Sequence, residues 1–132
     1  MRNLLRGYQF SLIANVQSGR PLTASVGGDP NGDTNTSTDR PPYVGRNTYT
    51  GPNFATADMR VTRDIALHGE HTVLRLMFEA FNVTNRANFN SITTAQYNFN
   101  ATTRVFTPNA TFLTPTTTFD PRILQLAAKI TF

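Results

Sequence analysis

The chain has 132 residues, enough for one small domain, and it contains no Cys, which excludes a disulfide framework and a thiolate metal site. Only 15% of its residues are charged, below the roughly 25% of soluble domains, whereas its ten Phe and four Tyr suit strands joined by polar loops. The net charge of +4 comes almost wholly from singly scattered Arg residues, so we expect no nucleic-acid partner.

The first predicted element is a strand over residues 7–17. Its apolar side chains occupy every second position: Tyr8, Phe10, Leu12, Ala14 and Val16. This period of two is typical of a strand whose two faces meet different surroundings. Residues 1–6 show no apolar core of a signal peptide, so we expect the chain to be a fragment of a longer exported protein. No stretch approaches the roughly 18–20 apolar residues of a membrane helix.

A long polar loop over residues 18–55 follows, and it carries oxygen side chains at alternate positions. These candidate metal ligands are Asp29, Asn31, Asp33 and Asn35, followed by Asp39. Calcium loops use this spacing, but an EF-hand needs Gly where Thr34 stands and Glu where Arg40 stands. The same residue types are ordinary turn formers. The sequence therefore leaves open both a calcium-binding loop and a metal-free polar loop.

Two strands are predicted over residues 56–67 and 71–84, joined by a short turn at His68, Gly69 and Glu70. Both strands alternate, apart from Arg63, which interrupts an apolar face. We expect one shared face to hold Met59, Val61, Ile65, Leu74, Leu76 and Phe78. We expect the opposite face to point into a lumen and to hold Asp58, Arg60, Arg75 and Glu79. His68 and His71 have no third zinc ligand nearby and are expected to be turn histidines.

A second long loop, over residues 85–121, precedes a last strand over residues 122–132. That strand is long enough to cross a membrane when tilted, since roughly 9–11 residues suffice. Its apolar positions are Leu124, Leu126, Ala128, Ile130 and Phe132. A soluble domain seldom stops on a fully apolar strand face, so this end favours a strand that faces lipid. Long loops on one side and a short turn on the other are typical of a bacterial outer-membrane barrel.

Two stretches resemble TonB-dependent receptors. Asp29-Pro-Asn-Gly-Asp33, followed by Asp39-Arg40-Pro41, resembles their D-x-N-G-D…D-R-P loop. Residues 79–89, which read EAFNVTNRANF, are similar to a stretch near their C-termini. The match is closest to the Oar-like subgroup, which has a carboxypeptidase-regulatory-like domain. The resemblance implies the last four strands of a barrel of about 22 strands, without its plug domain, its TonB box and about eighteen strands.

The resemblance also implies the partners and the activity. The partners would be the remainder of the barrel and its plug, the barrel-assembly machinery, TonB, outer-membrane lipid and an unidentified nutrient ligand. The assembly machinery would read the last strand as a signal. The intact protein would be an outer-membrane receptor that imports its ligand with energy from TonB.

A second class of function, a secreted β-sandwich that adheres or binds through a calcium-holding loop, also accounts for the alternation. Extraction distinguishes the two, because a barrel wall needs detergent and a sandwich stays in buffer. No nucleophile and base are arranged for catalysis: the chain has no G-x-S-x-G motif, and Asp64 and Glu70 form no convincing acid–base pair. We therefore expect no enzyme. Because four strands leave two open edges, we also expect an open antiparallel sheet with poorly packed loops.

Overall fold

The computed structural model describes residues 7–36, 39–68 and 72–132, without the side chain of His68. These residues form eleven strands and contain no helix that is long and apolar enough to span a membrane. The predicted all-β class is therefore confirmed. The chain divides into two compact units. The sheet unit comprises Met1–Val16, Ala55–Ala87 and Asp120–Phe132, and the loop unit comprises Gln17–Phe54 and Asn88–Phe119.

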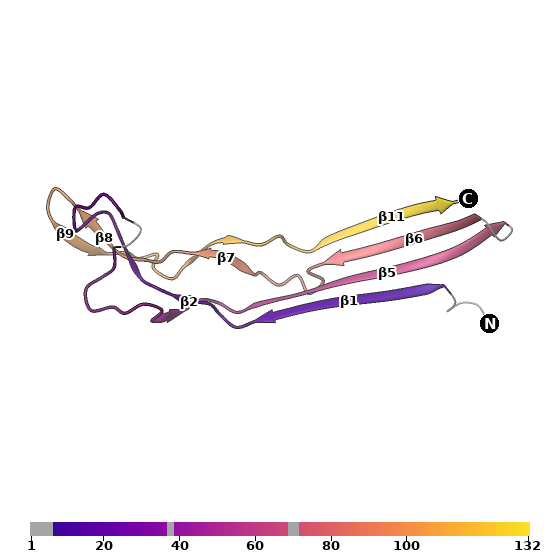
Figure 1. Ribbon diagram of the computed structural model, residues 1–132, viewed down its shortest axis with the longest axis horizontal. Helices are drawn as coiled ribbons and strands as arrows, with labels where there is room; N and C mark the ends of the chain where they lie inside the picture. Colours follow the sequence, from indigo (N-terminus) through magenta and orange to yellow (C-terminus); the bar gives the residue numbers. More distant parts are fainter. Residues whose placement is uncertain (1–6, 37–38, 69–71) are drawn as a thin grey trace. The chain divides into compact units, whose positions relative to one another are not determined.

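The sheet unit is built on four long strands. They are β1 (Tyr8–Gln17), β5 (Phe54–His68), β6 (Thr72–Phe81) and β11 (Ile123–Thr131). They lie in the order β1-β5-β6-β11, as Figure 1 shows. Strand β6 is antiparallel to both β5 and β11. The predicted turn between the middle strands, with Gly69, Glu70 and His71, lies outside the described residues.

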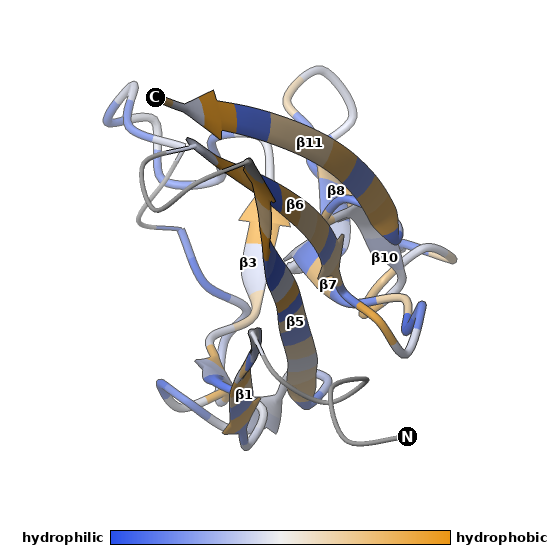
Figure 2. Ribbon diagram, turned by 90° about the vertical axis from the view of Figure 1, so that its right-hand side faces the viewer, coloured by the Kyte–Doolittle hydropathy of each residue, from blue (hydrophilic) through white to orange (hydrophobic). Residues whose placement is uncertain are grey.

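The register of β5, β6 and β11 determines which side chains share a face. Leu74 pairs with Ile65, and Phe78 pairs with both Val61 and Leu126. Directly paired residues point to the same side of a sheet. The expected sharing of one face by Leu74, Leu76 and Phe78 with Met59, Val61 and Ile65 is confirmed. Figure 2 shows the resulting alternation of hydrophobic and hydrophilic bands along the strands.

We call the two sides the apolar face and the polar face. On β5, β6 and β11 the apolar face holds Met59, Val61, Arg63, Ile65, Leu74, Leu76, Phe78, Ala80, Leu124, Leu126, Ala128 and Ile130. The polar face holds Arg60, Thr62, Asp64, Val73, Arg75, Met77, Glu79, Gln125 and Lys129. Every charged residue of the three strands except Arg63 is thus on the polar face, among the described pairs.

Strand β6 ends at Phe81, three residues before the predicted end, because the next residue turns the chain. Asn82 has a φ of 49° and Asn85 a φ of 51°. Asn tolerates this left-handed region better than most residues. The Asn82 side chain also accepts a hydrogen bond from the Arg86 N–H at 3.2 Å. Both asparagines therefore form the bend that follows β6.

The four-stranded sheet is open, as expected for four strands. Among the strands that the structure describes, β1 and β11 each have a neighbour on one side only. Buried apolar side chains are few in the described part of the chain, namely Ala24, Val26 and Ala80. Of these, Ala80 alone belongs to the sheet unit. Apart from Ala80, the described residues of the sheet thus form no apolar core on either face.

The loop unit contains paired strands and is compact, so the expectation of poorly packed loops is wrong. It contains β2 (Pro21–Leu22), β3 (Ser25–Gly27), β4 (Tyr49–Thr50), β7 (Phe89–Ile92), β8 (Ala95–Asn100), β9 (Val105–Pro108) and β10 (Pro115–Thr118). Strand β8 pairs with β3 in parallel and with β9 in a hairpin. Edge-to-face ring pairs, Tyr49 with Phe112 and Phe54 with Phe119, add apolar contacts. Its Thr- and Phe-rich segments thus find strand partners that are distant in sequence.

Candidate functional site

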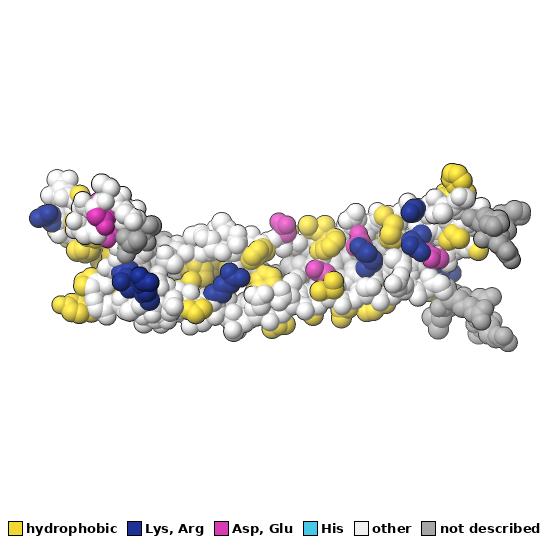
Figure 3. Space-filling model, viewed as in Figure 1, with side chains coloured by type: hydrophobic (Ala, Val, Ile, Leu, Met, Phe, Trp, Pro, Cys, Tyr) yellow, Lys and Arg dark blue, Asp and Glu magenta, His cyan; other side chains and the backbone are white. Residues whose placement is uncertain are grey.

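The polar face carries two ion pairs between neighbouring strands. Arg60 on β5 pairs with Glu79 on β6. Arg75 on β6 binds Asp64 on β5 through two hydrogen bonds, Nε to Oδ1 and Nη2 to Oδ2, each 2.7 Å long. Figure 3 shows Lys and Arg side chains beside Asp and Glu side chains over this sheet. Charged side chains of the polar face therefore pair across β5 and β6, although Asp64 was not among the predicted site residues.

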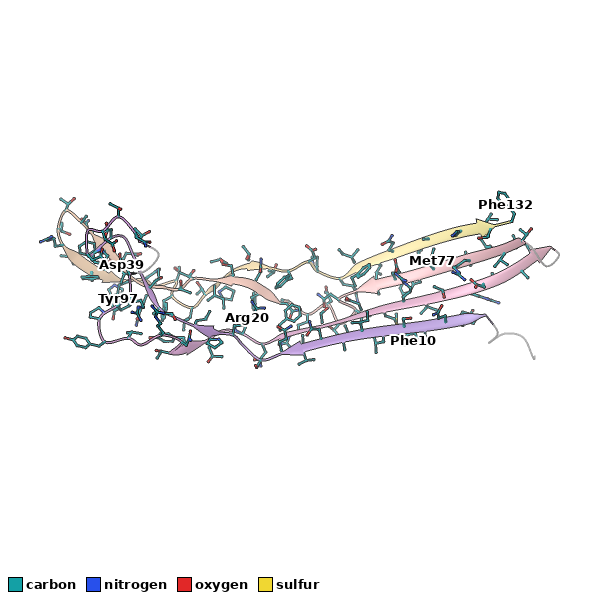
Figure 4. All side chains as sticks on the ribbon, in the orientation of Figure 1. Phe10, Arg20, Asp39, Met77, Tyr97 and Phe132 are labelled. Atoms are coloured by element: carbon teal, nitrogen blue, oxygen red, sulfur yellow. The ribbon has the colours of Figure 1, made fainter. Side chains whose placement is uncertain are left out.

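A shallow cavity of about 130 Å³ lies on the same face. It is lined by Gln9, Ser11, Arg60, Thr62, Arg75 and Met77. These side chains come from three adjacent strands, β1, β5 and β6. Figure 4 labels Met77 on β6 and Phe10 on β1. Because Gln9 and Ser11 line this cavity together with Arg60 and Arg75, the polar positions of β1 lie on the same side of the sheet as the ion pairs.

Asp58 has a different role from the other predicted polar residues. Its Oδ1 accepts a hydrogen bond from the backbone N–H of Asn82 at 2.9 Å. Asn82 is buried, and its Nδ2 donates to the carbonyls of Arg86 at 3.0 Å and Asp120 at 3.3 Å. Asp58 therefore helps to hold the bend at the end of β6, a role that strand alternation alone does not indicate.

The apolar face exposes large hydrophobic side chains. Leu126 on β11 is 81% exposed and Phe10 on β1 is 61% exposed. The predicted signal residues Leu124, Leu126, Ala128 and Ile130 all lie on this face of β11, and Phe132 follows the strand. Their recognition by an assembly machinery stays a prediction. A continuous apolar surface of this kind is characteristic of a sheet side that meets lipid or a protein partner.

Arg63 is the one charged residue on the apolar face among the described pairs. Its guanidinium lies over the ring of Tyr8, 4.9 Å from the ring centre. Such a cation–π contact compensates part of the cost of removing the charge from water. The aliphatic stem of an Arg can cover apolar surface while its charge stays hydrated. Arg63 is therefore accommodated on this face by a partner on β1.

In the loop unit, the acidic loop, which we define as residues 29–36 together with Asp39, brings three carboxylates together. One carboxylate oxygen each from Asp29, Asp33 and Asp39 lies within 4.8 Å of the other two. Asp29 Oδ1 accepts the Gly32 N–H at 2.7 Å and Asp29 Oδ2 accepts the Thr34 N–H at 2.8 Å. These bonds close the loop on itself.

The two predicted amide ligands, Asn31 and Asn35, form hydrogen bonds with Asp33 inside the loop. Asn31 Oδ1 accepts the Asp33 N–H at 2.9 Å, and Asn31 Nδ2 donates to Asp33 Oδ2 at 3.0 Å. The Asn35 N–H donates to Asp33 Oδ1 at 2.8 Å. Of the five predicted metal ligands, the structure thus gathers the three aspartates, with the two asparagines supporting the turn.

Asp39 is the most buried member of this cluster, with 6% of its surface exposed. Its Oδ2 finds no hydrogen-bond partner among the described residues. Burial, and then the negative charges of Asp33 and Asp29, raise the pKa of the Asp39 carboxyl above its usual value. Its backbone carbonyl accepts the Val26 N–H at 3.0 Å, which joins the loop to β3. Figure 4 labels Asp39 in the loop unit.

An open cavity of about 640 Å³ adjoins Asp39. It is lined by Thr23, Ala24, Ser25, Thr36, Asp39, Arg40, Arg46, Asn47 and Thr94. Sequence reasoning missed most of this lining. The Asn47 N–H donates to Thr23 Oγ1 at 2.9 Å, and Asn47 has a φ of 57°. Because Asn adopts the left-handed region more readily than most residues, Asn47 itself is a local sequence signal for a turn in this segment.

A family model described as an outer membrane beta barrel domain matches residues 43–125, which is more than half of the chain. The match includes β5, β6 and the beginning of β11. Comparisons with curated proteins and with solved structures gave no match.

Proposed function

The chain belongs to the outer membrane beta barrel domain family, and from this membership we propose that it forms part of a receptor that imports a nutrient ligand across the bacterial outer membrane. The chain is located in the outer membrane. Its long strands are barrel strands, and the four of them form an open sheet and not a closed barrel. The proposal adds the activity, uptake driven by TonB.

The two-faced sheet is the observation that carries the proposal. Lipid tails accept the exposed leucines and isoleucines of the apolar face. The ion pairs Arg60–Glu79 and Asp64–Arg75 on the other face suit a water-filled interior. Charges at mid-depth on a lipid face would cost about 2–4 kcal/mol for Arg or Lys. A sheet built this way supports a wall between lipid and an aqueous lumen.

Dependence on TonB is supported by the sequence motifs. The D-x-N-G-D loop that starts at Asp29 and the EAFN stretch that starts at Glu79 both resemble segments of TonB-dependent receptors. In this proposal the loop unit contributes to the mouth of the barrel, and the polar cavity beside Asp39 provides ligand-accessible surface. The plug and the segment that contacts TonB belong to the parent receptor. The activity is binding and gated passage, without a covalent step.

A transport experiment tests this proposal. The gene for the intact receptor is deleted in its own bacterium, and growth is measured on limiting iron chelates, corrinoids, glycans and peptides as single nutrient sources. We expect one nutrient class to lose its high-affinity uptake, and we expect the same loss in a strain without TonB. Complementation with the intact receptor should restore uptake only where TonB is present. Equal uptake with and without TonB would contradict the proposal.

A further inference from the structure

The acidic loop gathers negative charge for which the described residues supply no counter-ion. Arg40 and Arg46 line the adjoining cavity, yet neither forms an ion pair with Asp29, Asp33 or Asp39 in the described part of the chain. Like charges this close repel one another, and each raises the energy of ionising its neighbours. A bound cation would remove this repulsion.

Asp39 provides a second and independent indication of a ligand. Its side chain is more than nine-tenths buried, and its Oδ2 is unpartnered among the described residues. Buried carboxylates are almost always paired with a charge or bound to a metal, because an uncompensated one is costly. One oxygen of the Asp39 carboxylate lies within 4.8 Å of an oxygen of Asp29 and of Asp33, so this buried carboxylate adjoins the other two.

The geometry of the cluster suits a large hard cation. Calcium binds carboxylate oxygens at about 2.3–2.6 Å, so two ligands on opposite sides of one ion lie up to roughly 5 Å apart. The three oxygens fall within that span. Magnesium requires a near-ideal octahedron at about 2.0–2.1 Å, which a loop with ligands at irregular intervals is poorly placed to supply.

We propose that the acidic loop binds one Ca²⁺ ion through the carboxylates of Asp29, Asp33 and Asp39, with water completing the coordination. Asp33 is exposed, which leaves room for water on its side of the ion. Because the Asp39 carbonyl accepts the Val26 N–H, the ion would also tie the loop to β3. The site does not depend on which nutrient the receptor imports.

Radioactive calcium in equilibrium dialysis tests the site. The intact receptor is purified from outer membranes in detergent, stripped with EDTA and dialysed against calcium. Asp39→Asn is the direct variant, and Asp33→Asn is a second variant at an exposed position that should fold normally. Asp120→Asn is the matched control, since Asp120 is also exposed and lies outside the cluster. A gel shift on heating checks that each variant is folded.

We expect the wild type and Asp120→Asn to bind one more calcium ion per chain than Asp33→Asn and Asp39→Asn, at free calcium near the 10⁻⁴–10⁻³ M that is typical of extracellular sites. The two cluster variants should bind at least about tenfold more weakly, because each removes one negative charge from the ligand set. Folded Asp33→Asn protein that binds as much calcium as Asp120→Asn would overturn the proposal. Displacement of the calcium by equimolar magnesium would overturn the assignment of the ion.

Discussion

The Asp58 carboxylate accepts the backbone N–H of Asn82 at 2.9 Å, so a side chain of β5 holds the residue at which β6 stops. Asn82 is buried and left-handed, with a φ of 49°. It also donates to two carbonyls, those of Arg86 and Asp120. This small network therefore links the ends of β5 and β6 to the segment that leads into β11.

Asp58→Ala should destabilise the folded barrel by about 1–2 kcal/mol, because it leaves the buried Asn82 N–H without its acceptor. Asp58→Asn is the control, since an amide oxygen can still accept this bond. The measurement is the free energy of unfolding in urea, from lipid vesicles that contain the intact receptor. An alanine variant as stable as the wild type would show that water replaces the carboxylate.

Asn82→Ala should be less stable than Asn82→Gly, although both remove the same side-chain hydrogen bonds. A Cβ-bearing residue without a polar side chain pays about 1 kcal/mol in the left-handed region, and Gly does not. Unfolding in urea measures the difference between the two variants. Equal stability would mean that the backbone at this bend relaxes when Asn82 is replaced.

Leu126→Arg should impair folding in the membrane, whereas Gln125→Arg should be mild. The two positions are neighbours on β11 but lie on opposite faces, because Leu126 pairs with Phe78 and Gln125 with Glu79. Arg on a lipid face costs up to about 2–4 kcal/mol at mid-depth, and Arg opposite Glu79 gains an attractive pair. The fraction of receptor that shifts on a gel after heating reports the result. If Gln125→Arg is the more harmful change, the lipid side has been assigned to the wrong face.

Gly19→Ala should loosen the loop unit. A Cβ at Gly19 would lie 1.8 Å from the carbonyl oxygen of Gly51, so the backbone must move. That shift opposes the Gly51 N–H bond to the Arg20 carbonyl, which is 2.9 Å long. We expect limited proteolysis of the loop to become roughly tenfold faster, since cleavage follows the population of opened states.

Gly45→Ala is the control for this experiment. Its Cβ would approach a side-chain atom, Thr48 Oγ1, at 3.3 Å, and a small rotation relieves the contact. Its proteolysis should remain close to that of the wild type. Similar rates for Gly19→Ala and Gly45→Ala would show that the close approach of the two glycine segments does not stabilise the loop unit.

The facing of the strands was predictable because period two leaves only two choices for each strand. One apolar position, such as Leu76, fixes the face of all its neighbours on β6. The partners across the sheet were less predictable, since they depend on the register. Arg75, for example, binds Asp64, which the register places directly opposite it on β5.

The loop unit could not be predicted in the same way. Ser25 pairs with Ala95, about seventy residues away. The alternation of residues 95–100, AQYNFN, is typical of a strand, but it does not indicate that the three-residue β3 is the partner. The pairing depends on main-chain groups, which the sequence does not distinguish. The burial of Asp39 follows from this packing and also leaves no local signal. The spacing of Asp29 and Asp33, by contrast, is local, and the sequence was sufficient to indicate their proximity.

The contact between Arg63 and Tyr8 has a consequence for how deep the sheet sits in the bilayer. Tyr rings favour the headgroup level, and Arg on a lipid face costs about 0–1 kcal/mol there. Tyr8 is the first residue of β1, so the contact lies where that strand begins. We therefore expect this pair to mark one boundary of the hydrocarbon core of the bilayer. Movement of the strands along the membrane normal would then carry the charged Arg63 guanidinium into the hydrocarbon, which is costly.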